Sequence, residues 1–201
     1  MAGETDGPVS RWLNRRLSRP LATALARTPV SPDAVTWLSL ALAAGAGTFV
    51  AAGWNVVGGV GVQLASVVDG VDGDLARRTG RTSRRGALLD AVLDRYADAA
   101  VIAGLGYFAA HHQGYAAPYV AAAAALAGSL AVSYTRARAE ASAGVVPGPA
   151  FLGLASRDVR LLALAVGAVS GQVYWTLWGV AAVALVTVGW RLWRLWRWGR
   201  T

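Results

Sequence analysis

Apolar stretches of about 20 residues, the length at which a helix crosses the hydrocarbon core of a bilayer, recur along this sequence with only short polar links between them. Helices suit that environment because each one makes its backbone hydrogen bonds internally. The composition agrees, since 55% of the 201 residues are hydrophobic and the mean hydropathy is +0.43. The sequence therefore predicts an all-α, polytopic membrane protein with six transmembrane helices.

Six spans are expected between polar or glycine-containing links. Their approximate ranges are 33–53, 56–77, 84–110, 116–137, 157–171 and 174–190. The first span has a clear start signal, because Ser31 can cap the helix, Pro32 suits its first position and Asp33 lies in its first turn. The longest polar connection is 138–158, which contains several helix-breaking residues. These are Gly144, Pro147, Gly148 and Pro149.

The segment before the first span, 8–27, has the pattern of an amphipathic helix. Its apolar side chains are Trp12, Leu13, Leu17, Leu21 and Leu25, and its basic ones are Arg11, Arg15, Arg16 and Arg19. Such a helix lies in the membrane interface with its basic face toward the headgroups. Pro20 is expected to kink or break it. We therefore divide the chain into an N-terminal amphipathic juxtamembrane segment, 1–30, and a six-helix transmembrane domain, 31–201.

Basic residues indicate the orientation of the chain. All 19 are arginine, and apart from Arg95 they occur before span one, around the link between spans two and three, around the link between spans four and five, and after span six. Positively charged links stay in the cytoplasm, so both termini are expected on the cytoplasmic side of a prokaryotic plasma membrane. The net charge of +8 does not indicate nucleic-acid binding, because the arginines cluster where anionic headgroups lie. His111 and His112 are expected in a solvated turn on the opposite side.

Four carboxylates flank the link between spans two and three, namely Asp69, Asp72, Asp90 and Asp94. Their spacings of three and four place each pair on one helix face, and antiparallel helices would bring the pairs together at the cytoplasmic end. Four such charges repel each other unless cations neutralise them. Oxygen ligands suit Mg²⁺ or Mn²⁺, and two such ions would clamp a diphosphate.

Other interpretations of the acidic cluster were weighed. The acids could form structural ion pairs with Arg77, Arg84, Arg85 and Arg95, or they could belong to a divalent-cation transporter or a non-catalytic membrane scaffold. A transporter needs a polar route across the bilayer, whereas these acids all lie at one end of the spans. The ion-pair and scaffold interpretations leave Gly73, Ala76 and Gly86 unexplained, small residues that let a ligand or a helix approach closely.

The acidic stretch also carries a longer pattern. It reads Asp69-x-x-Asp72-Gly73-x-x-Ala76-Arg77, eight residues, then Gly86-x-x-x-Asp90-x-x-x-Asp94. This resembles the signature of the CDP-alcohol phosphotransferase family, and the resemblance extends over most of the chain. It implies metal-dependent transfer of a substituted phosphate group from a CDP-alcohol to the hydroxyl of an acceptor alcohol, with release of CMP.

The same resemblance implies roles for individual residues. Asp69, Asp72, Asp90 and Asp94 would bind two divalent cations, Mg²⁺ or Mn²⁺. Asp94 would also be the catalytic general base on the acceptor hydroxyl. Arg77 would donate to the phosphates as a bidentate group, and Ser83 would meet the diphosphate. The CDP-binding residues implied as a set are Pro32, Asp33, Asp69, Gly73, Ala76, Arg77, Ser83 and Gly86.

Two further acids lie outside the pattern. Asp74 is about 200° around the helix from Asp72 and should point away from the metals. Asp98 continues the face of Asp90 and Asp94 by one turn. We favour a helix-packing role or a hydrogen bond that does not involve Arg95 over support of the metal ligands.

Arginines at the cytoplasmic ends of spans four and five are the candidate acceptor site. They are Arg136, Arg138, Arg157 and Arg160. Guanidinium groups suit an acceptor that carries its own phosphate, such as inositol phosphate or glycerol phosphate. Contact with lipid headgroups is the alternative.

Within the family, DGVDGDLAR, LDAVLDRYAD and SRDVR resemble most the branch that makes inositol phosphodiesters from CDP-inositol. They resemble less closely the prokaryotic phosphatidylinositol-phosphate synthases, which use CDP-diacylglycerol. Either CDP-alcohol remains open as the donor. A fused cytidylyltransferase domain, which some members of the first group carry, is not expected here. We also expect a homodimer, contact with membrane lipids and no nucleic-acid partner.

Overall fold

The structure is a computed structural model that describes residues 9–143 and 154–198, and every regular element in those residues is helical. The elements in chain order are η1 (Ser10–Asn14, a π-helix), α1 (Arg15–Leu25), α2 (Pro32–Ala51), α3 (Asn55–Thr79), α4 (Arg84–His112), α5 (Pro118–Ala143), α6 (Arg157–Val169) and α7 (Val173–Trp198). The all-α prediction is therefore confirmed for the described residues.

The predicted start of the first span is confirmed. The Ser31 hydroxyl accepts a hydrogen bond from the Ala34 N–H at 3.2 Å, and Pro32 is the first residue of α2. Asp33 lies in the first turn, where a carboxylate interacts favourably with the positive end of the helix dipole. Local capping chemistry therefore places the first turn of α2.

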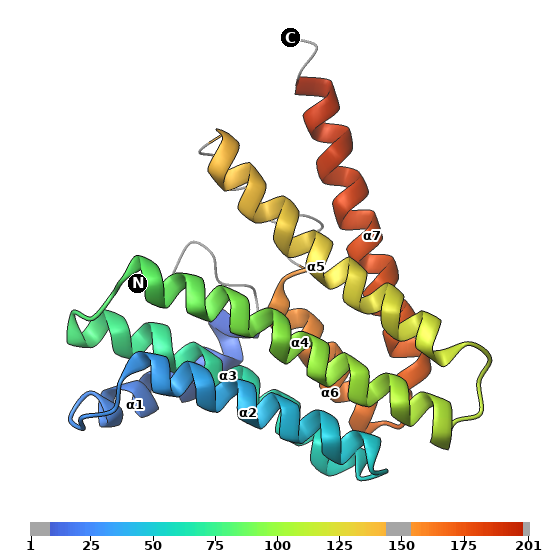
Figure 1. The fold of residues 1–201 in the computed structure, drawn as a ribbon, viewed down its shortest axis with the longest axis horizontal. Coiled ribbons are helices and arrows are strands. Elements are labelled where there is room, and N and C mark those ends of the chain that lie inside the picture. Colours follow the sequence, from blue (N-terminus) through green and yellow to red (C-terminus); the bar gives the residue numbers. More distant parts are fainter. Residues whose placement is uncertain (1–8, 144–153, 199–201) are drawn as a thin grey trace.

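A tight turn, 80–83, joins α3 to α4. α3 ends because Gly80 takes the left-handed conformation with φ 67°, which glycine adopts without steric cost. Ser83 then caps α4 by accepting from the Gly86 N–H at 3.0 Å. α3 and α4 therefore run in opposite directions, as Figure 1 shows.

α2 is central to the packing, because it lies against both α3 and α4. α3 and α4 make little direct contact with each other, and α3 packs instead on α2 and α6. α5 packs on α7 and α4. In Figure 1 the helices α2, α3, α4 and α6 lie side by side, while α5 and α7 diverge from them at one end. Fully buried side chains of the core include Val50, Val62, Val101, Leu105 and Leu177.

Glycines bring α2 and α4 together. A Cβ built on Gly104 would overlap the carbonyl oxygen of Gly47, and one on Gly47 would overlap the carbonyl oxygen of Ala100. Small residues at such a contact allow the dense backbone packing on which membrane helices depend. This contact holds α4, the helix that carries Asp90 and Asp94, against α2.

Adding one carbon at this contact is expected to destabilise the protein. Gly104→Ala should lower the free energy of unfolding by about 1–3 kcal/mol, the usual cost of overfilling a packed core. Unfolding in detergent, followed by circular dichroism, measures this. The matched control is Gly45→Ala on α2, where no atom lies within 4 Å of an added Cβ. Equal stability of the two variants would contradict the close contact.

Four helical segments are long and apolar enough to cross a membrane, namely Pro32–Ala51, Asn55–Thr79, Pro118–Ala141 and Val173–Arg194. α6 has only 13 residues, and at about 1.5 Å per residue it is shorter than the hydrocarbon core. α4 is long but begins with several charged side chains. Six spans therefore remain a prediction for α4 and α6.

The helix predicted before the first span forms, but Pro20 does not break it, because α1 runs through this residue. Pro20 has no N–H to donate to the carbonyl of Arg16, four residues earlier. Both residues are exposed. The basic side chains divide between two environments, since Arg15 is buried while Arg16 is exposed. The prediction that Arg15 faces headgroups is therefore wrong. The interfacial position of α1 stays a prediction.

Some predictions concern residues beyond those described. The helix-breaking role of Gly144, Pro147, Gly148 and Pro149 lies outside them, as do residues 1–8 of the juxtamembrane segment. The turn predicted at His111 and His112 is wrong, because both residues belong to the last turn of α4. Each ring stacks on the aromatic ring one turn earlier, Tyr107 and Phe108 respectively, which extends the helix. Both histidines are exposed.

Candidate active site

The structure brings carboxylates of α3 and α4 together. One oxygen each of Asp69, Asp90 and Asp94 lies within 4.8 Å of the others. Asp90 and Asp94 lie one turn apart on one face of α4, and α3 brings Asp69 to them. Three of the four predicted metal ligands therefore form one carboxylate group.

Two oxygens of this group lack a hydrogen-bond donor. Asp69 Oδ1 and Asp94 Oδ1 are buried without one among the described residues. A buried polar atom without a partner is costly, and hard divalent cations bind carboxylate oxygens. The donor set therefore fits a divalent cation.

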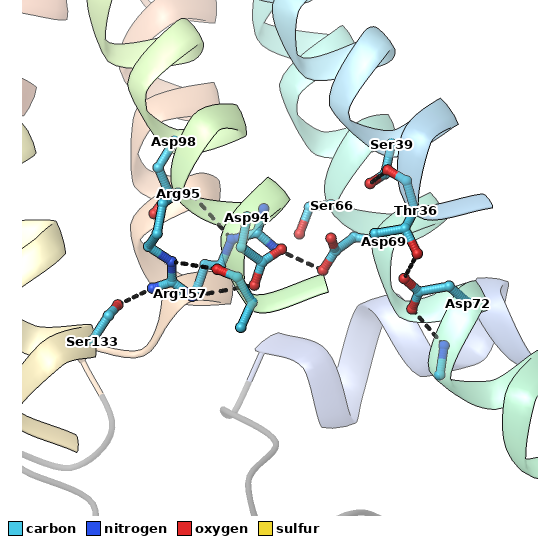
Figure 2. Close-up of polar contacts among 12 residues, drawn as sticks. Thr36, Ser39, Ser66, Asp69, Asp72, Asp94, Arg95, Asp98, Ser133 and Arg157 are labelled. Atoms are coloured by element: carbon cyan, nitrogen blue, oxygen red, sulfur yellow. Dashed lines mark hydrogen bonds and ion pairs between the residues drawn. The ribbon is translucent and has the colours of Figure 1, made fainter. Parts of the chain in front are cut away.

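Asp72, the fourth predicted ligand, stands slightly apart from the group. Its Oδ2 accepts from the Thr36 hydroxyl at 2.6 Å, and its Oδ1 accepts from the Gly73 N–H. Figure 2 shows Asp72 beside Thr36 of α2, on the other side of Asp69 from Asp94. Asp72 therefore joins the carboxylate group to the surface of α2.

Arg157, at the start of α6, enters the carboxylate group. Its Nη1 lies 2.6 Å from Asp69 Oδ2 and 2.9 Å from Asp94 Oδ1. The second contact is an ion pair without hydrogen-bond geometry, since Asp94 Oδ1 has no donor. Arg95 adds a weaker pair with Asp94 at 3.3 Å and also contacts Ser133 (Figure 2). Arg95, one of the arginines predicted as ion-pair partners of the acids, therefore contacts the carboxylate group at Asp94.

Asp98 holds two arginines of α6. It accepts from Arg157 Nε at 3.0 Å and from Arg160 Nη2 at 3.1 Å. Its residue surface is only 3% exposed, and removing one partner of such a buried pair is strongly destabilising. Asp98 thus has a hydrogen-bonding role that does not involve Arg95, and it ties α4 to α6.

A cavity of about 210 Å³ opens beside the carboxylate group. Of the predicted CDP-binding residues, those that line it are Pro32, Asp33, Gly73, Ala76, Arg77, Ser83 and Gly86. Asp72 and Asp90 line it too, whereas Asp69 does not. The cavity therefore meets the carboxylate group at Asp90.

Several lining residues were missed from the sequence, namely Thr36, Arg81, Thr82 and Ala87. Thr36 follows Pro32 by one helical turn, so the two share a face of α2. Arg81 and Thr82 belong to the link that closes the cavity. Thr36 could have been identified because it lies one turn after Pro32, and the other three because they lie within four residues of Ser83.

The candidate acceptor residues fall into two places. Arg157 contacts Asp69 and Asp94 of the carboxylate group, whereas Arg160 contacts Asp98. Arg136 instead pairs with Glu140 of its own helix at 2.8 Å, and Arg138 lies exposed on the same helix, α5. Among the contacts described for these arginines, those of Arg157 reach Asp69 and Asp94.

Fold and site together describe a helical membrane enzyme with an oxygen-ligand site beside a polar cavity. A model of the CDP-alcohol phosphatidyltransferase family matches residues 29–193, and the chain belongs to this family. It is therefore a CDP-alcohol phosphotransferase and an integral membrane protein. Membership sets aside the transporter and scaffold interpretations.

The chain is similar to curated proteins with two descriptions. It is 53% identical over 171 residues to a bifunctional IPC transferase and DIPP synthase of Rubrobacter xylanophilus, a match that covers 85% of this chain but only 38% of that protein. It is 39% identical over 174 residues to a phosphatidylinositol phosphate synthase of Mycobacteroides abscessus, covering 86% of this chain and 77% of that protein.

Crystal structures of the phosphatidylinositol phosphate synthase of Mycobacterium tuberculosis have the same fold. The one with CDP-DAG bound matches with a TM-score of 0.78 at 30% identity, over 90% of this chain and 94% of that one. The complex with manganese and citrate matches with a TM-score of 0.76 at 30% identity, over 89% of this chain and 88% of that one.

Proposed function

We propose that this enzyme transfers a substituted phosphate group from a CDP-alcohol to a phosphorylated polyol, such as inositol phosphate, and releases CMP at the cytoplasmic face of a prokaryotic plasma membrane. The observation that carries the proposal is the shared position of Asp90. Its side chain belongs to the carboxylate group and also lines the cavity. A diphosphate in the cavity would therefore lie at the acids.

Asp69, Asp72, Asp90 and Asp94 would hold two divalent cations, Mg²⁺ or Mn²⁺. Bound there, the ions would neutralise the diphosphate and the charge that develops on the leaving phosphate. The buried Asp69 Oδ1, which has no hydrogen-bond donor among the described residues, supports this assignment, as does the manganese complex of the solved relative.

Asp94 would act as the general base. The acceptor oxygen forms a bond to the phosphorus that carries the donor alcohol, and the bond from that phosphorus to the leaving CMP oxygen breaks. The proton of the acceptor hydroxyl passes to the Asp94 carboxylate.

The cavity would bind the CDP moiety. Pro32 and Asp33, at the start of α2, would border the nucleotide, while Gly73 and Gly86 allow its phosphates to approach the backbone. Arg77 would donate to the phosphates, and Ser83, at the cap of α4, would meet the diphosphate. Phosphoryl transfer depends mainly on such positioning and charge neutralisation.

The acceptor would carry its own phosphate. Arg157 presents its guanidinium group beside the proposed base, and Arg160 pairs with Asp98 one turn further along α4. Arg136 and Arg138 would extend this acceptor site, and contact with lipid headgroups is their alternative role. The described contacts support the α6 pair more directly than the α5 pair.

CDP-diacylglycerol and CDP-inositol are the two candidate donors. The crystal structure with CDP-DAG bound supports the lipid donor, and the match to the Rubrobacter protein keeps the soluble donor open. We also propose six spans and a homodimer in contact with membrane lipids.

The test combines donors with acceptors. Purified protein in detergent with Mg²⁺ would be incubated with CDP-diacylglycerol or CDP-inositol, paired with inositol, inositol phosphate or glycerol phosphate, and CMP release would be measured. We expect CMP with one donor, only when Mg²⁺ and a phosphorylated acceptor are present. No CMP from any pair, in protein that still binds Mn²⁺, would overturn the proposed function. Equal rates with inositol and inositol phosphate would remove the acceptor phosphate from the proposal.

A further inference from the structure

We propose that Asp74 is a positioning residue of the donor site, which orients Arg77 in the nucleotide cavity and is itself held by Arg15 and Ser18 of α1. This inference rests on the proposed function in one respect, since it takes Arg77 as a contact of the CDP phosphates. It makes α1 part of the donor site, although α1 does not line the cavity.

Asp74 accepts from donors on two helices. Arg15 Nη1 and Arg77 Nη2 both reach Asp74 Oδ1, the latter at 2.8 Å, and the Ser18 hydroxyl donates to Oδ2 at 3.2 Å. The side chains of Arg15 and Asp74 are each only 10% exposed. Asp74 therefore points toward α1 and away from the carboxylate group, as predicted, and its carboxylate position is fixed from both sides.

Arg77 depends on this anchor for its position. Its side chain is 54% exposed, and a long, exposed arginine samples many rotamers. In the structure its guanidinium lies over Gly73, where a built Cβ would be 3.3 Å from Nη1. Asp74 holds Nη2, and the remaining N–H groups stay beside the cavity that Arg77 lines. A fixed guanidinium binds phosphate with less loss of side-chain entropy.

α1 supplies the rest of the anchor because its polar side faces the protein. Arg15 and Ser18 are buried, whereas Trp12, Leu17 and Leu21 are exposed. Ala22 also packs against α2 and α3. Since Arg15 is the only charged partner of Asp74 outside α3 among the described residues, loss of Arg15 would leave Asp74 with Arg77 alone.

The test measures donor binding separately from turnover. Asp74→Asn is expected to raise the Kd for CDP, measured by titration calorimetry with Mg²⁺, and the KM for the donor, each by about 3- to 10-fold. The kcat and the Kd for Mn²⁺ should change by less than about twofold, because Asp74 does not belong to the carboxylate group. Unchanged CDP binding would overturn the inference.

A double-mutant cycle with Arg77→Ala separates positioning from general structure. If Asp74 acts through Arg77, Asp74→Asn should weaken CDP binding no further in the Arg77→Ala background. An equal additional loss there would overturn the inference, as would an Arg77→Ala protein that binds CDP normally. A wild-type protein that binds CDP but releases no CMP would instead overturn the proposed function, and the binding cycle would still decide the role of Asp74.

Variants of α1 complete the experiment and provide the matched control. Arg15→Gln and Ser18→Ala each remove one contact to Asp74 and should raise the Kd for CDP by smaller factors than Asp74→Asn. They also test the inference if Asp74→Asn does not fold. Arg16→Gln makes the same charge change at an exposed neighbour on α1 and should leave CDP binding unchanged. Equal effects of Arg15→Gln and Arg16→Gln would overturn the proposed role of α1.

Discussion

Asp94→Asn is expected to lower turnover by at least about 100-fold, the smaller end of the contribution that a general base makes. Asparagine keeps the shape of the side chain and one oxygen ligand, but its amide cannot accept the proton of the acceptor hydroxyl. Asp94 is not among the residues that line the cavity. The variant should therefore still bind CDP in the presence of a divalent cation.

Single-turnover CMP release and calorimetric CDP binding, made on the same preparation, check this expectation. Circular dichroism would show that the helices remain intact. Turnover close to that of the wild-type protein would remove Asp94 as the base. Lost CDP binding would instead mean that Asp94 acts mainly as a ligand.

Asp90→Asn is expected to abolish metal binding, CDP binding and turnover together, because Asp90 is common to the carboxylate group and the cavity. Changes to the groups that merely support metal ligands cost about 10- to 100-fold in affinity or activity, so loss of a ligand should exceed that. Asp90→Asn thus provides the contrast to Asp94→Asn, which keeps CDP binding.

The same variant is expected to lose the stabilisation that metal gives to the wild-type protein. Asp90 has no ion pair among the described residues, unlike Asp69 and Asp94, so without metal it adds repulsion to the group. Asp90→Asn should therefore unfold at a higher temperature than wild type without divalent cations. The wild-type protein should gain stability with Mn²⁺ by mass action, and the variant should not. A thermal melt in detergent with and without Mn²⁺ decides this, and an equal Mn²⁺ gain in both proteins would contradict the ligand role.

Local patterns in the sequence predicted most of the helices and the position of the acids. The cap at Ser31 and the glycine at Gly80 act within a few residues, so they place helix ends reliably. The acidic pairs could be predicted because their spacing puts each pair on one face. The position of Arg157 near the acids was also predicted, because this residue begins a short helix.

Contacts between distant segments could not be predicted in the same way. The partner of Asp74 is Arg15, 59 residues away, and no local pattern marks either residue. The sequence indicated that Arg15 faces lipid headgroups, since a basic residue on an amphipathic helix usually does so. In the folded protein Arg15 instead faces α3, where it pairs with the buried carboxylate of Asp74, a group that is costly to bury without a cation.

The predicted arginine cluster shows a similar limit. Charge placement alone predicted Arg136 near Arg157, because both lie at ends of neighbouring predicted spans that were expected on the same side of the membrane. In the structure Arg136 pairs with Glu140 of its own helix, and α5, which packs on α7, diverges from α4 at one end (Figure 1). The angle at which two helices cross depends on the packing of both helix surfaces, so the spacing of residues within one segment does not predict it.

α2 supplies none of the four acids, yet it is the spacer between the two helices that do. Its side chains Ser39 and Ala43 face a small void bounded by Ala65 of α3 and Ala97 of α4. α2 therefore helps to hold apart the two helices that carry the acidic pairs. Mg²⁺ binds oxygens at about 2.0–2.1 Å and Ca²⁺ at about 2.3–2.6 Å. For the proposed cations, discrimination between ions of different radius would thus depend in part on a helix that supplies none of the acids.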